Sequence, residues 1–351
     1  MSAERFALPA EWQPQAAIVV AWPHEETDWA PRLKRVEACY VALIAAITRF
    51  EPALICVANE TLRARAAQLL TVASVDPTRL QFVELPYDDT WLRDTGPLTL
   101  SDGAGFRVCD FRFTGWGGKF GAEQDDALAA TLVERGLFRN SEYRRIDWAL
   151  EGGAIESDGA GTLLTTWRCM HQRHPDQSRG AIDEHLHQML GAKRVLWLDH
   201  GYLEGDDTDA HIDTLARFAP DDAIVFQACN DPSDAHHHEL AHMRDELAAL
   251  RTRDGRAYRL YPLPWPRPIV EDGRRLAASY ANYLVVNGGV MVPTYDDPAD
   301  EEAQRMIALA HPKREVVGVP CRSLIWQNGS LHCLTMQLPA GVLAMERADS
   351  A

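Results

Sequence analysis

The stretch Thr162–Leu198, TLLTTWRCMHQRHPDQSRGAIDEHLHQMLGAKRVLWL, carries the pattern that best indicates the fold of this chain. Two short runs rich in β-forming residues, 162–166 and 194–198, enclose a longer segment, 178–190, for which we predict a helix. Glycine, proline and aspartate residues separate or bound the three segments, as is typical of turns between regular elements. The stretch therefore predicts one strand–helix–strand unit.

The same alternation of short strands and amphipathic helices continues along most of the chain. We predict other strands over 17–21, 53–57, 81–85, 223–228, 258–263, 283–286 and 290–293, and other helices over 31–50, 60–72, 123–135, 234–250 and 298–310. The last four helices begin at residues 123, 178, 234 and 298, so a similar unit returns roughly every 60 residues. This period is typical of a solenoid or a propeller-like array, in which five or six ββαβ-type units would account for 351 residues.

A doubly wound α/β sheet is the competing architecture. Such sheets usually carry a glycine-rich phosphate-binding loop after the first strand, and no such loop follows the predicted strand 17–21. The segment 262–268, PLPWPRP, is rich in proline but short, which indicates a rigid connection rather than a linker between domains. We therefore expect residues 1–351 to form a single α/β domain.

The composition is that of an acidic globular protein. Lys and Arg number 35 against 51 Asp and Glu, which gives a formal net charge of −16, and 46% of the residues are hydrophobic. This charge is unfavourable for binding nucleic acid or an anionic membrane and suits a cationic ligand. The seven cysteines are scattered and form no CxxC pair, which is typical of a reduced intracellular protein. With no recognisable secretory signal and no apolar run longer than 38–47, we expect a cytoplasmic protein.

Four acidic or histidine-bearing stretches lie beside glycine or proline, where strands end and loops begin. Each alone is typical of a structural feature, such as a capped turn, a glycine loop or, for the cysteine of the predicted apolar strand 331–338, a small core residue. The four stretches are DDTWLRDTGP (88–97), EGG (151–153), GDDTDAHID (205–213) and NGSLHC (328–333).

Together these stretches contain the groups that one reaction on a planar cation requires. Asp94 and Asp213 would grip a guanidinium, whose N–H donors fit two bidentate carboxylates. The thiol of Cys333 would attack the central carbon, and His211 would protonate the departing ammonia and then activate water. Glu151 would orient the imidazolium, as the acid of a catalytic triad does. The combination predicts a thiol-based hydrolase of guanidines.

Six stretches of the chain, in this order, resemble the agmatine deiminase family. They are WPHEETDW (22–29), WLRDTGP (91–97), GWGGK (115–119), EGG (151–153), DDTDAHID (206–213) and LHC (331–333). The resemblance implies the pentein fold, a five-bladed α/β propeller of ββαβ-type units around a pseudo-fivefold axis. It also implies hydrolysis of agmatine to N-carbamoylputrescine and ammonia in putrescine and polyamine biosynthesis, without a metal or organic cofactor. A homodimer is expected from the same resemblance.

The resemblance implies a role for each matched polar residue. Cys333 is expected to form a covalent amidino (thiouronium) intermediate, with His211 as general acid and base. Asp94 and Asp213 are expected to bind the guanidinium, and Glu151 to support His211. Because nearby carboxylates and burial raise the pKa of a thiol, we expect the cationic substrate or a protonated His211 to favour the thiolate.

The remaining expected contacts concern the substrate channel. Trp91 and Trp116 are expected to line it, and Asp207, which lies four residues before His211, is expected to bind the far ammonium of the substrate. The sequence departs from the usual family pattern at Thr114, at Met336 and in the loop 327–330, QNGS, which is commonly GGGN. These departures concern loop mobility and substrate range rather than the proposed acid–base and thiol groups.

A bacterial peptidyl-arginine deiminase is the nearest alternative. Such an enzyme needs cationic side chains to hold the carboxylate of a C-terminal arginine. The corresponding stretch here, TGWGG (114–118), offers none, but Arg112 lies close by.

A zinc hydrolase is an alternative from a different class, and a binding protein without activity is a third. His238-Glu239-Leu240-Ala241-His242 matches H-E-x-x-H on a predicted helix, where His238 and His242 share one face. A third ligand is lacking, because Asp245 stands where an extended motif has glycine and Glu271 has no supporting motif. The presence of all five chemical residues argues against an inactive relative.

Overall fold

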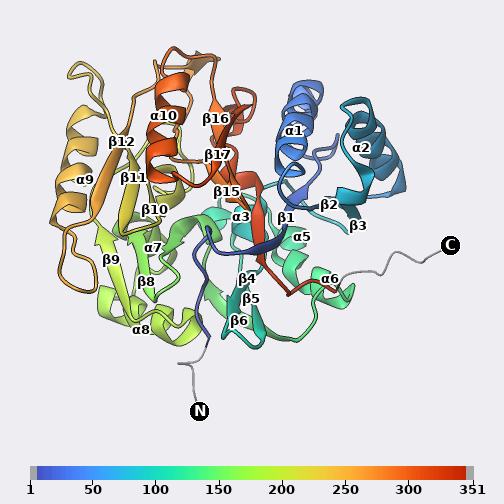
Figure 1. The fold of residues 1–351 in the computed structure, drawn as a ribbon, viewed down its shortest axis with the longest axis horizontal. Helices are drawn as coiled ribbons and strands as arrows, with labels where there is room; N and C mark the ends of the chain where they lie inside the picture. Colours follow the sequence, from blue (N-terminus) through green and yellow to red (C-terminus); the bar gives the residue numbers. More distant parts are fainter. Residues whose placement is uncertain (1–5, 345–351) are drawn as a thin grey trace.

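Five small mixed sheets repeat one pattern of strands in the computed structural model, which describes residues 6–344. In each sheet an antiparallel pair is followed by a parallel neighbour, and a helical connection links the two parallel strands. Parallel neighbours require such a crossover, whereas antiparallel neighbours need only a short turn. In Figure 1 the sheets lie around the centre of the view in the order of the chain.

The strand order is the same in four of the five sheets and is extended by one strand in the other. The extended sheet runs β18 (Met336–Pro339), β1 (Gln15–Ala21), β2 (Ala53–Val57) and β3 (Leu80–Glu84). The others are β4 (Leu98–Ser101), β5 (Phe106–Arg112) and β6 (Ser141–Ala149); β7 (Ile155–Ser157), β8 (Thr162–Thr166) and β9 (Arg194–Leu198); β10 (Ala216–Ala219), β11 (Ala223–Gln227) and β12 (Arg259–Leu263); and β15 (Leu284–Val286), β16 (Gly289–Thr294) and β17 (Glu315–Pro320). A short ribbon, β13 (Val270–Glu271) and β14 (Arg274–Arg275), follows β12.

The longer helices cover the sheets with one apolar face each. In α8 (Arg179–Leu190), the buried side chains of Ile182, Leu186 and Leu190 recur every four residues, which places them on one side of the helix. The other connecting helices are α1 (Leu33–Ile47), α2 (Glu60–Val72), α5 (Glu123–Asp126), α6 (Leu128–Glu134), α7 (Trp167–Arg173), α9 (His237–Ala249) and α10 (Asp300–Ala310), and two short helical turns are α3 (Leu92–Thr95) and α4 (Gly115–Gly118).

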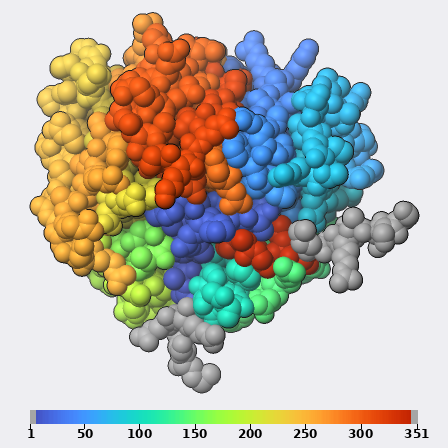
Figure 2. Space-filling model, in the orientation of Figure 1, coloured from blue at the N-terminus to red at the C-terminus, as the bar shows by residue number. Residues whose placement is uncertain are grey.

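The last strand of the chain completes the first sheet. β18 pairs antiparallel with β1, with Gln15 opposite Pro339 and Val19 opposite Met336. Figure 2 shows the corresponding dark-blue and red segments side by side near the middle of one face, with the other parts of the chain around them. The residues just before β18, which include Cys333, are thereby held near the start of the chain.

Several predicted elements match the structure to the residue, and others were wrong in part. β2, β8, β9 and α2 have the predicted bounds. The predicted helix 31–50 begins only at Leu33, because a 3-10 turn that contains Pro31 precedes it, and the predicted helix 123–135 is divided at Ala127. The predicted strand 331–338 is wrong at its start, because residues 332–334 form a 3-10 turn and the strand begins at Met336. Among residues 6–344, no helix is long and apolar enough to span a membrane.

Candidate active site

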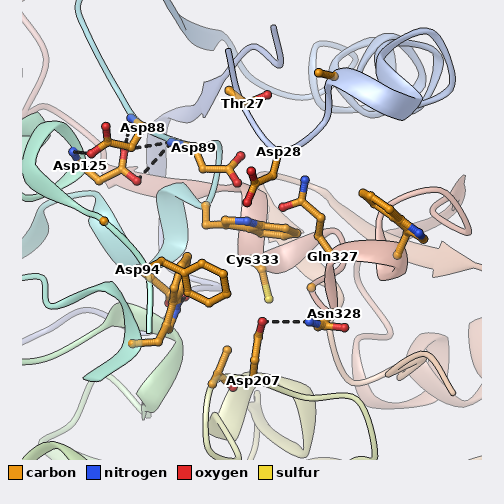
Figure 3. A pocket seen from close by; sticks show the side chains of 18 of the residues that line it. Thr27, Asp28, Asp88, Asp89, Asp94, Asp125, Asp207, Gln327, Asn328 and Cys333 are labelled. Carbon is orange, nitrogen blue, oxygen red and sulfur yellow. Dashed lines mark hydrogen bonds between the residues drawn. The ribbon is translucent and has the colours of Figure 1, made fainter. Parts of the chain in front are cut away.

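Loops from several sheets enclose a cavity of about 640 Å³ that contains Cys333. In Figure 3, Asp28 and Asp89 lie on one side of this cysteine, and Asp207 and Asn328 lie on the other. Five of the eight residues predicted from the sequence line the cavity, namely Trp91, Asp94, Trp116, Asp207 and Cys333. The other three, His211, Glu151 and Asp213, are buried and contact these lining residues or one another.

The thiol of Cys333 lies at the end of the cavity and is 4% exposed. The side-chain amide of Asn282 donates a hydrogen bond to its sulfur over 3.2 Å and another to Asp213 Oδ2 over 3.2 Å. The sulfur lies 3.6 Å from Asp213 Oδ2. Burial, followed by the charges of Asp213 and Asp94, raises the pKa of the Cys333 thiol well above its usual range. The resting thiol is therefore protonated at neutral pH, as the carboxylates around it predict.

Asn282 is a site residue that the sequence did not reveal. It follows a turn before β15 and belongs to no recognisable motif. Besides its two side-chain donations, its Oδ1 accepts hydrogen bonds from the backbone N–H groups of His332 and Cys333, over 3.0 and 3.3 Å. It therefore positions Cys333 and the neighbouring carboxylate of Asp213 together.

The carboxylate of Asp94 is fixed by one donor on each oxygen. The N–H of Gly153 donates to Oδ1 over 3.0 Å, and the indole N–H of Trp116 donates to Oδ2 over 2.9 Å. A Cβ at residue 153 would come within 2.6 Å of His211 Nδ1 and 2.8 Å of Asp94 Oδ1, so this position of the EGG motif requires glycine. Burial, only partly offset by His211, raises the pKa of Asp94 to about 6.

Trp116 reaches Asp94 from an unusual stretch of backbone. Its φ of 55° and the φ of 84° at Gly117 place both residues in the left-handed region. For a residue other than glycine this conformation costs about 1–2 kcal/mol, so it persists only where the surroundings hold it. The hydrogen bond to Asp94, and edge-on ring contacts with Phe113 and Phe120, supply that support.

The imidazole of His211 is buried between two carboxylates. Nδ1 lies 3.6 Å from Asp94 Oδ1, and Nε2 lies 3.5 Å from Glu151 Oε2. Burial opposes the charged ring, but Asp94, Cys169 and Glu151 outweigh it, so the pKa of His211 lies well above its usual range. Arg173 donates to Glu151 Oε1 over 2.7 Å and helps to keep the pKa of Glu151 below its usual range. The arrangement favours an imidazolium, which is suited to deliver a proton.

Asp213 is connected to a buried network below the cavity. The Nδ1 atom of His332 lies 2.8 Å from Asp213 Oδ2, and its Nε2 lies 2.7 Å from Glu11 Oε2. Arg217 donates to Glu11 Oε2 over 2.7 Å. Burial opposes ionisation of Asp213, but His332 and His211 outweigh it and lower the pKa of this carboxyl group. Asp213 therefore carries its charge before a substrate arrives, and its Oδ1 has no hydrogen-bond partner among the described residues.

The loop before Cys333 packs directly on the cavity wall. A Cβ at residue 329 would meet the ring of Trp91 at 2.3 Å, so Gly329 is required for this close approach. The ring of Trp91 in turn contacts Trp29, with centroids 5.6 Å apart. Asn328 donates a hydrogen bond to Asp207 Oδ2 over 2.8 Å. The unusual QNGS loop thus takes part in the cavity wall through its asparagine and its glycine.

The mouth of the cavity is strongly acidic. Among residues 6–344, seven carboxylates and one basic residue line the cavity. The basic residue is Arg274, which donates to Asn328 Oδ1 over 2.7 Å and also to the carbonyl of Trp326. The acidic residues are Glu26, Asp28, Asp88, Asp89, Asp94, Asp125 and Asp207. Burial raises the pKa of Asp89 to about 7, because carboxylates crowd one another away from water here. A cation in the cavity would favour the ionised form.

Three residues that kept alternative functions open, Arg112, His238 and His242, lie outside this cavity. Arg112, at the end of β5, pairs with Asp147 over 3.0 Å and is not among the lining residues. His238 and His242 of the H-E-x-x-H match lie on α9, but the side chain of His242 contacts His200, with ring centroids 4.9 Å apart. His238 belongs to no group of three possible metal ligands among residues 6–344. The predicted geometry of a zinc protease is therefore absent from the described part of α9.

Mixed α/β sheets that carry a buried thiol, an imidazole and several carboxylates define a deiminase-type hydrolase of guanidines. The match to known proteins gives the particular family. The chain belongs to the Porphyromonas-type peptidyl-arginine deiminase family, whose model matches residues 7–339. The resemblance to agmatine deiminases that the motifs predicted is also confirmed, because several agmatine deiminases are about one-third identical to this chain.

The relatives match over nearly the whole chain. The agmatine deiminase of Pseudomonas putida (strain F1) is 35% identical, over 97% of this chain and 97% of its own length. A crystal structure from Porphyromonas gingivalis, provisionally named an arginine deiminase, is 44% identical with a TM-score of 0.90 and covers 96% of this chain and 99% of its own. Agmatine deiminase from C. jejuni, a cysteine-to-serine variant with substrate bound, is 32% identical with a TM-score of 0.88, covering 96% and 97%.

Proposed function

We propose that this chain hydrolyses agmatine to N-carbamoylputrescine and ammonia. The observation that carries the proposal is the charge of the cavity, in which seven acidic side chains and one basic side chain surround Cys333. Agmatine bears a guanidinium at one end and an ammonium at the other, so it matches this lining along its whole length. The names of the relatives, agmatine deiminases at 32–35% identity, support the same substrate.

The first half of the reaction displaces ammonia from the guanidinium. Asp94 and Asp213 would hold the guanidinium N–H groups, and their charges would fix its plane. The positive charge of the bound substrate lowers the pKa of the Cys333 thiol, which releases its proton to solvent, and the resulting thiolate attacks the central carbon. His211 donates a proton to the departing nitrogen, the carbon–nitrogen bond breaks, and ammonia leaves. An amidino group, covalently bound to Cys333, remains.

The second half returns the thiol and adds one water. The imidazole of His211, now neutral, takes a proton from a water molecule that attacks the same carbon. The carbon–sulfur bond then breaks, and N-carbamoylputrescine leaves while Cys333 is regenerated. Glu151 contacts His211 at 3.5 Å and is itself held by Arg173, so it would stabilise the imidazolium in both halves. All groups of this cycle come from the protein, and no metal or organic cofactor is invoked.

The ammonium end of agmatine would lie among the carboxylates of the cavity mouth. Asp207, the residue predicted for this role, lines the cavity and already accepts a hydrogen bond from Asn328. Asp89 lines the same cavity and has a pKa of about 7. We propose Asp207 as the ammonium contact and Asp89 as the source of a longer-range attraction. Asp207→Asn should then raise KM for agmatine more than Asp89→Asn does.

A peptidyl-arginine deiminase is the second candidate, because the family model carries that name. Its substrate would place a carboxylate near the cavity mouth, and Arg274 is the one basic lining residue in the described part of the chain. The guanidinium of Arg274 is already engaged by Asn328 and the carbonyl of Trp326. Seven carboxylates would repel the substrate carboxylate, so the cavity favours the diamine-like cation.

The substrate assignment can be tested by measuring ammonia release from agmatine, free arginine and a peptide with C-terminal arginine, each with and without EDTA. We expect turnover of agmatine alone, unchanged by EDTA. Preference for the peptide would replace the proposal by the second candidate, and loss of activity with EDTA would contradict a cofactor-free reaction.

Two cysteine variants form a matched pair for the role of the nucleophile. Cys333→Ser should abolish turnover and leave agmatine binding partly intact. Cys229→Ser changes a cysteine outside the cavity, whose sulfur lies 3.7 Å from the carbonyl of Asp231, and should keep the wild-type rate. Turnover by the Cys333→Ser variant at the wild-type rate would refute the covalent mechanism.

We also propose the finer features that the family resemblance implies. The five sheets would be the blades of a propeller around a pseudo-fivefold axis, with residues 1–351 as one domain. The protein would act as a homodimer in the cytoplasm, in putrescine and polyamine biosynthesis. Light scattering coupled to size-exclusion chromatography tests the dimer, since a monomeric mass at micromolar concentration would contradict it.

A further inference from the structure

A group of metal-binding side chains lies outside the cavity, on α9 and the loop that follows β9. One possible ligand atom from each of His200, Glu239 and His242 lies within 4.8 Å of the other two. Glu239 and His242 are three residues apart on the helix, so both project from one face. The loop residue His200 faces them, and its ring contacts that of His242 at a centroid distance of 4.9 Å.

We propose that His200, Glu239 and His242 form a binding site for a divalent transition metal, with Zn²⁺ as the best-suited ion. Two imidazoles and one carboxylate are a donor set that Zn²⁺ and its neighbours in the first row bind, whereas Mg²⁺ and Ca²⁺ prefer oxygen ligands alone. Ligands of a tetrahedral zinc ion lie about 3.4 Å from one another. The three candidate atoms lie within 4.8 Å of one another, so binding would draw them closer together, and the exposed side chain of His242 can rotate to allow this.

Neighbouring groups hold two of the three ligands in place. His200 Nδ1 lies 2.6 Å from Glu246 Oε1, which leaves the other ring nitrogen for an ion. The same carboxylate accepts hydrogen bonds from the backbone N–H groups of Asp199 and His200, over 3.0 and 3.2 Å. Glu239 Oε1 accepts from the N–H of Gly201 over 3.0 Å. Carboxylate and backbone partners of this kind orient metal ligands in known sites.

Exposure to solvent distinguishes these three residues from the two other groups of possible metal ligands among residues 6–344. Glu151, Cys169 and His211 are buried in the active site, and Glu11, Glu156 and His332 are buried in the network below it. In contrast, the side chain of His200 is 41% exposed, and His242 is also exposed. An ion can therefore reach the proposed site from solvent without any change in the core.

The proposed site uses the glutamate and the second histidine of the H-E-x-x-H motif, but not the first histidine. His238, the first histidine, contacts the ring of His237 instead and takes no part. An ion at this site would connect α9 to the end of β9, two elements that lie at the same edge of the molecule in Figure 1. Since only the folded chain brings them together, binding should stabilise the fold.

Calorimetric titration of Zn²⁺ into the tag-free, EDTA-treated full chain tests the proposal. We expect one ion per chain, with affinity at least tenfold weaker in His200→Ala and in His242→Ala, and unchanged in the matched control His238→Ala. The proposal is overturned if His238→Ala weakens binding as much as His242→Ala does. It is also overturned if none of the three variants changes the affinity.

The absorption spectrum of bound Co²⁺ distinguishes the proposed site from the buried group that contains the thiol of Cys169. Co²⁺ at the proposed site has nitrogen and oxygen ligands, so it should show d–d bands without thiolate-to-cobalt charge transfer. Charge-transfer bands that persist in His242→Ala would place the ion at Cys169 and contradict the proposal. Neither readout depends on catalysis, so failure here leaves the proposed agmatine hydrolysis untouched.

Discussion

His211 and His332 are both buried between two carboxylates, yet their pKa values are shifted in opposite directions. His211 lies between Asp94 and Glu151, and its pKa is raised well above the usual range. His332 lies between Asp213 and Glu11, but burial and two nearby guanidinium groups, those of Arg217 and Arg93, lower its pKa. The carboxylates around a buried histidine therefore do not alone determine its charge.

The difference separates two functions that resemble each other in sequence. A histidine that holds a proton in a negative environment can give it to a leaving group and take it back from water. A histidine with a lowered pKa, whose two ring nitrogens face Asp213 and Glu11, is suited to orient the Asp213 carboxylate, which lies 3.6 Å from the Cys333 sulfur. We therefore regard His211 as the acid–base group and His332 as a positioning residue.

Replacing His211 should cause the largest loss of activity. His211→Gln removes the proton donor and should lower kcat for agmatine about 100- to 10,000-fold, with a smaller change in KM. Steady-state kinetics with purified variants measures this, and His238→Gln, on the exposed side of α9, is the control that should retain activity. A loss of less than tenfold in His211→Gln would assign the proton transfer to another group.

Replacing His332 should act more weakly and in a different way. His332→Gln should lose one of the two contacts that His332 makes, with Asp213 and with Glu11. The Asp213 carboxylate then becomes less well placed, and kcat/KM should fall about tenfold, which corresponds to 1.4 kcal/mol. The free energy of unfolding should fall by about 1–3 kcal/mol, because a buried carboxylate loses its partner. Urea denaturation checks this stability term. A kcat loss as large as that of His211→Gln, without loss of stability, would mean that His332 is itself catalytic.

The pH dependence of the free energy of unfolding should show directly that the pKa values of His211 and His332 are shifted in opposite directions. The raised pKa of His211 stabilises the folded state fully below about pH 6.5, and this contribution is lost as the pH rises through the folded-state value. The lowered pKa of His332 has no effect above about pH 6.5 and destabilises the folded state increasingly as the pH falls below it.

Urea denaturation from pH 5 to pH 9 measures both contributions. The stability advantage of wild type over His211→Gln should shrink toward high pH, and the advantage over His332→Gln should shrink toward low pH. The same trend in both variants would contradict the assignment of opposite charge states.

The smallest effect is expected for the hydrogen bond that fixes Asp94. Trp116→Phe removes the indole donor, 2.9 Å from Asp94 Oδ2, and keeps most of the ring contacts. Because the N–H of Gly153 still holds the other oxygen of Asp94, the loss should be about 0.5–1.5 kcal/mol, as for an ordinary hydrogen bond, so kcat/KM should fall about two- to tenfold. Trp265→Phe, outside the cavity, is a matched indole control, since its N–H donates to Asp234 instead. Equal kinetics of both variants would show that the donor to Asp94 is dispensable.

Much of the repeat could be predicted from the sequence because buried strands are short and apolar. The strands 53–57, 162–166 and 194–198 were predicted to the residue; the first two are buried throughout, and the third is partly buried along its length. β6, with the sequence SEYRRIDWA, was missed, because its charged side chains are exposed and conceal the strand pattern. Local patterns therefore identify apolar strands better than strands that are rich in exposed charged side chains.

The residues of the candidate site could be predicted where they belong to short sequence motifs, and the others could not. Asp94, Glu151, His211, Asp213 and Cys333 are brought together as expected, although their roles stay predictions. The contact of Asn282 with Cys333 joins residues 51 positions apart, and that of Glu11 with His332 joins residues 321 positions apart. No local signal therefore marks Asn282, Glu11 or the different roles of His211 and His332.

The covalent step is the central claim, and intact-protein mass spectrometry of the acid-quenched reaction tests it most directly. During turnover of agmatine, the wild-type enzyme should accumulate an adduct with the mass of agmatine less one ammonia. Peptide mapping should place that adduct on Cys333. Agmatine turnover with no adduct at any time point, or an adduct on another cysteine such as Cys169, would contradict the account.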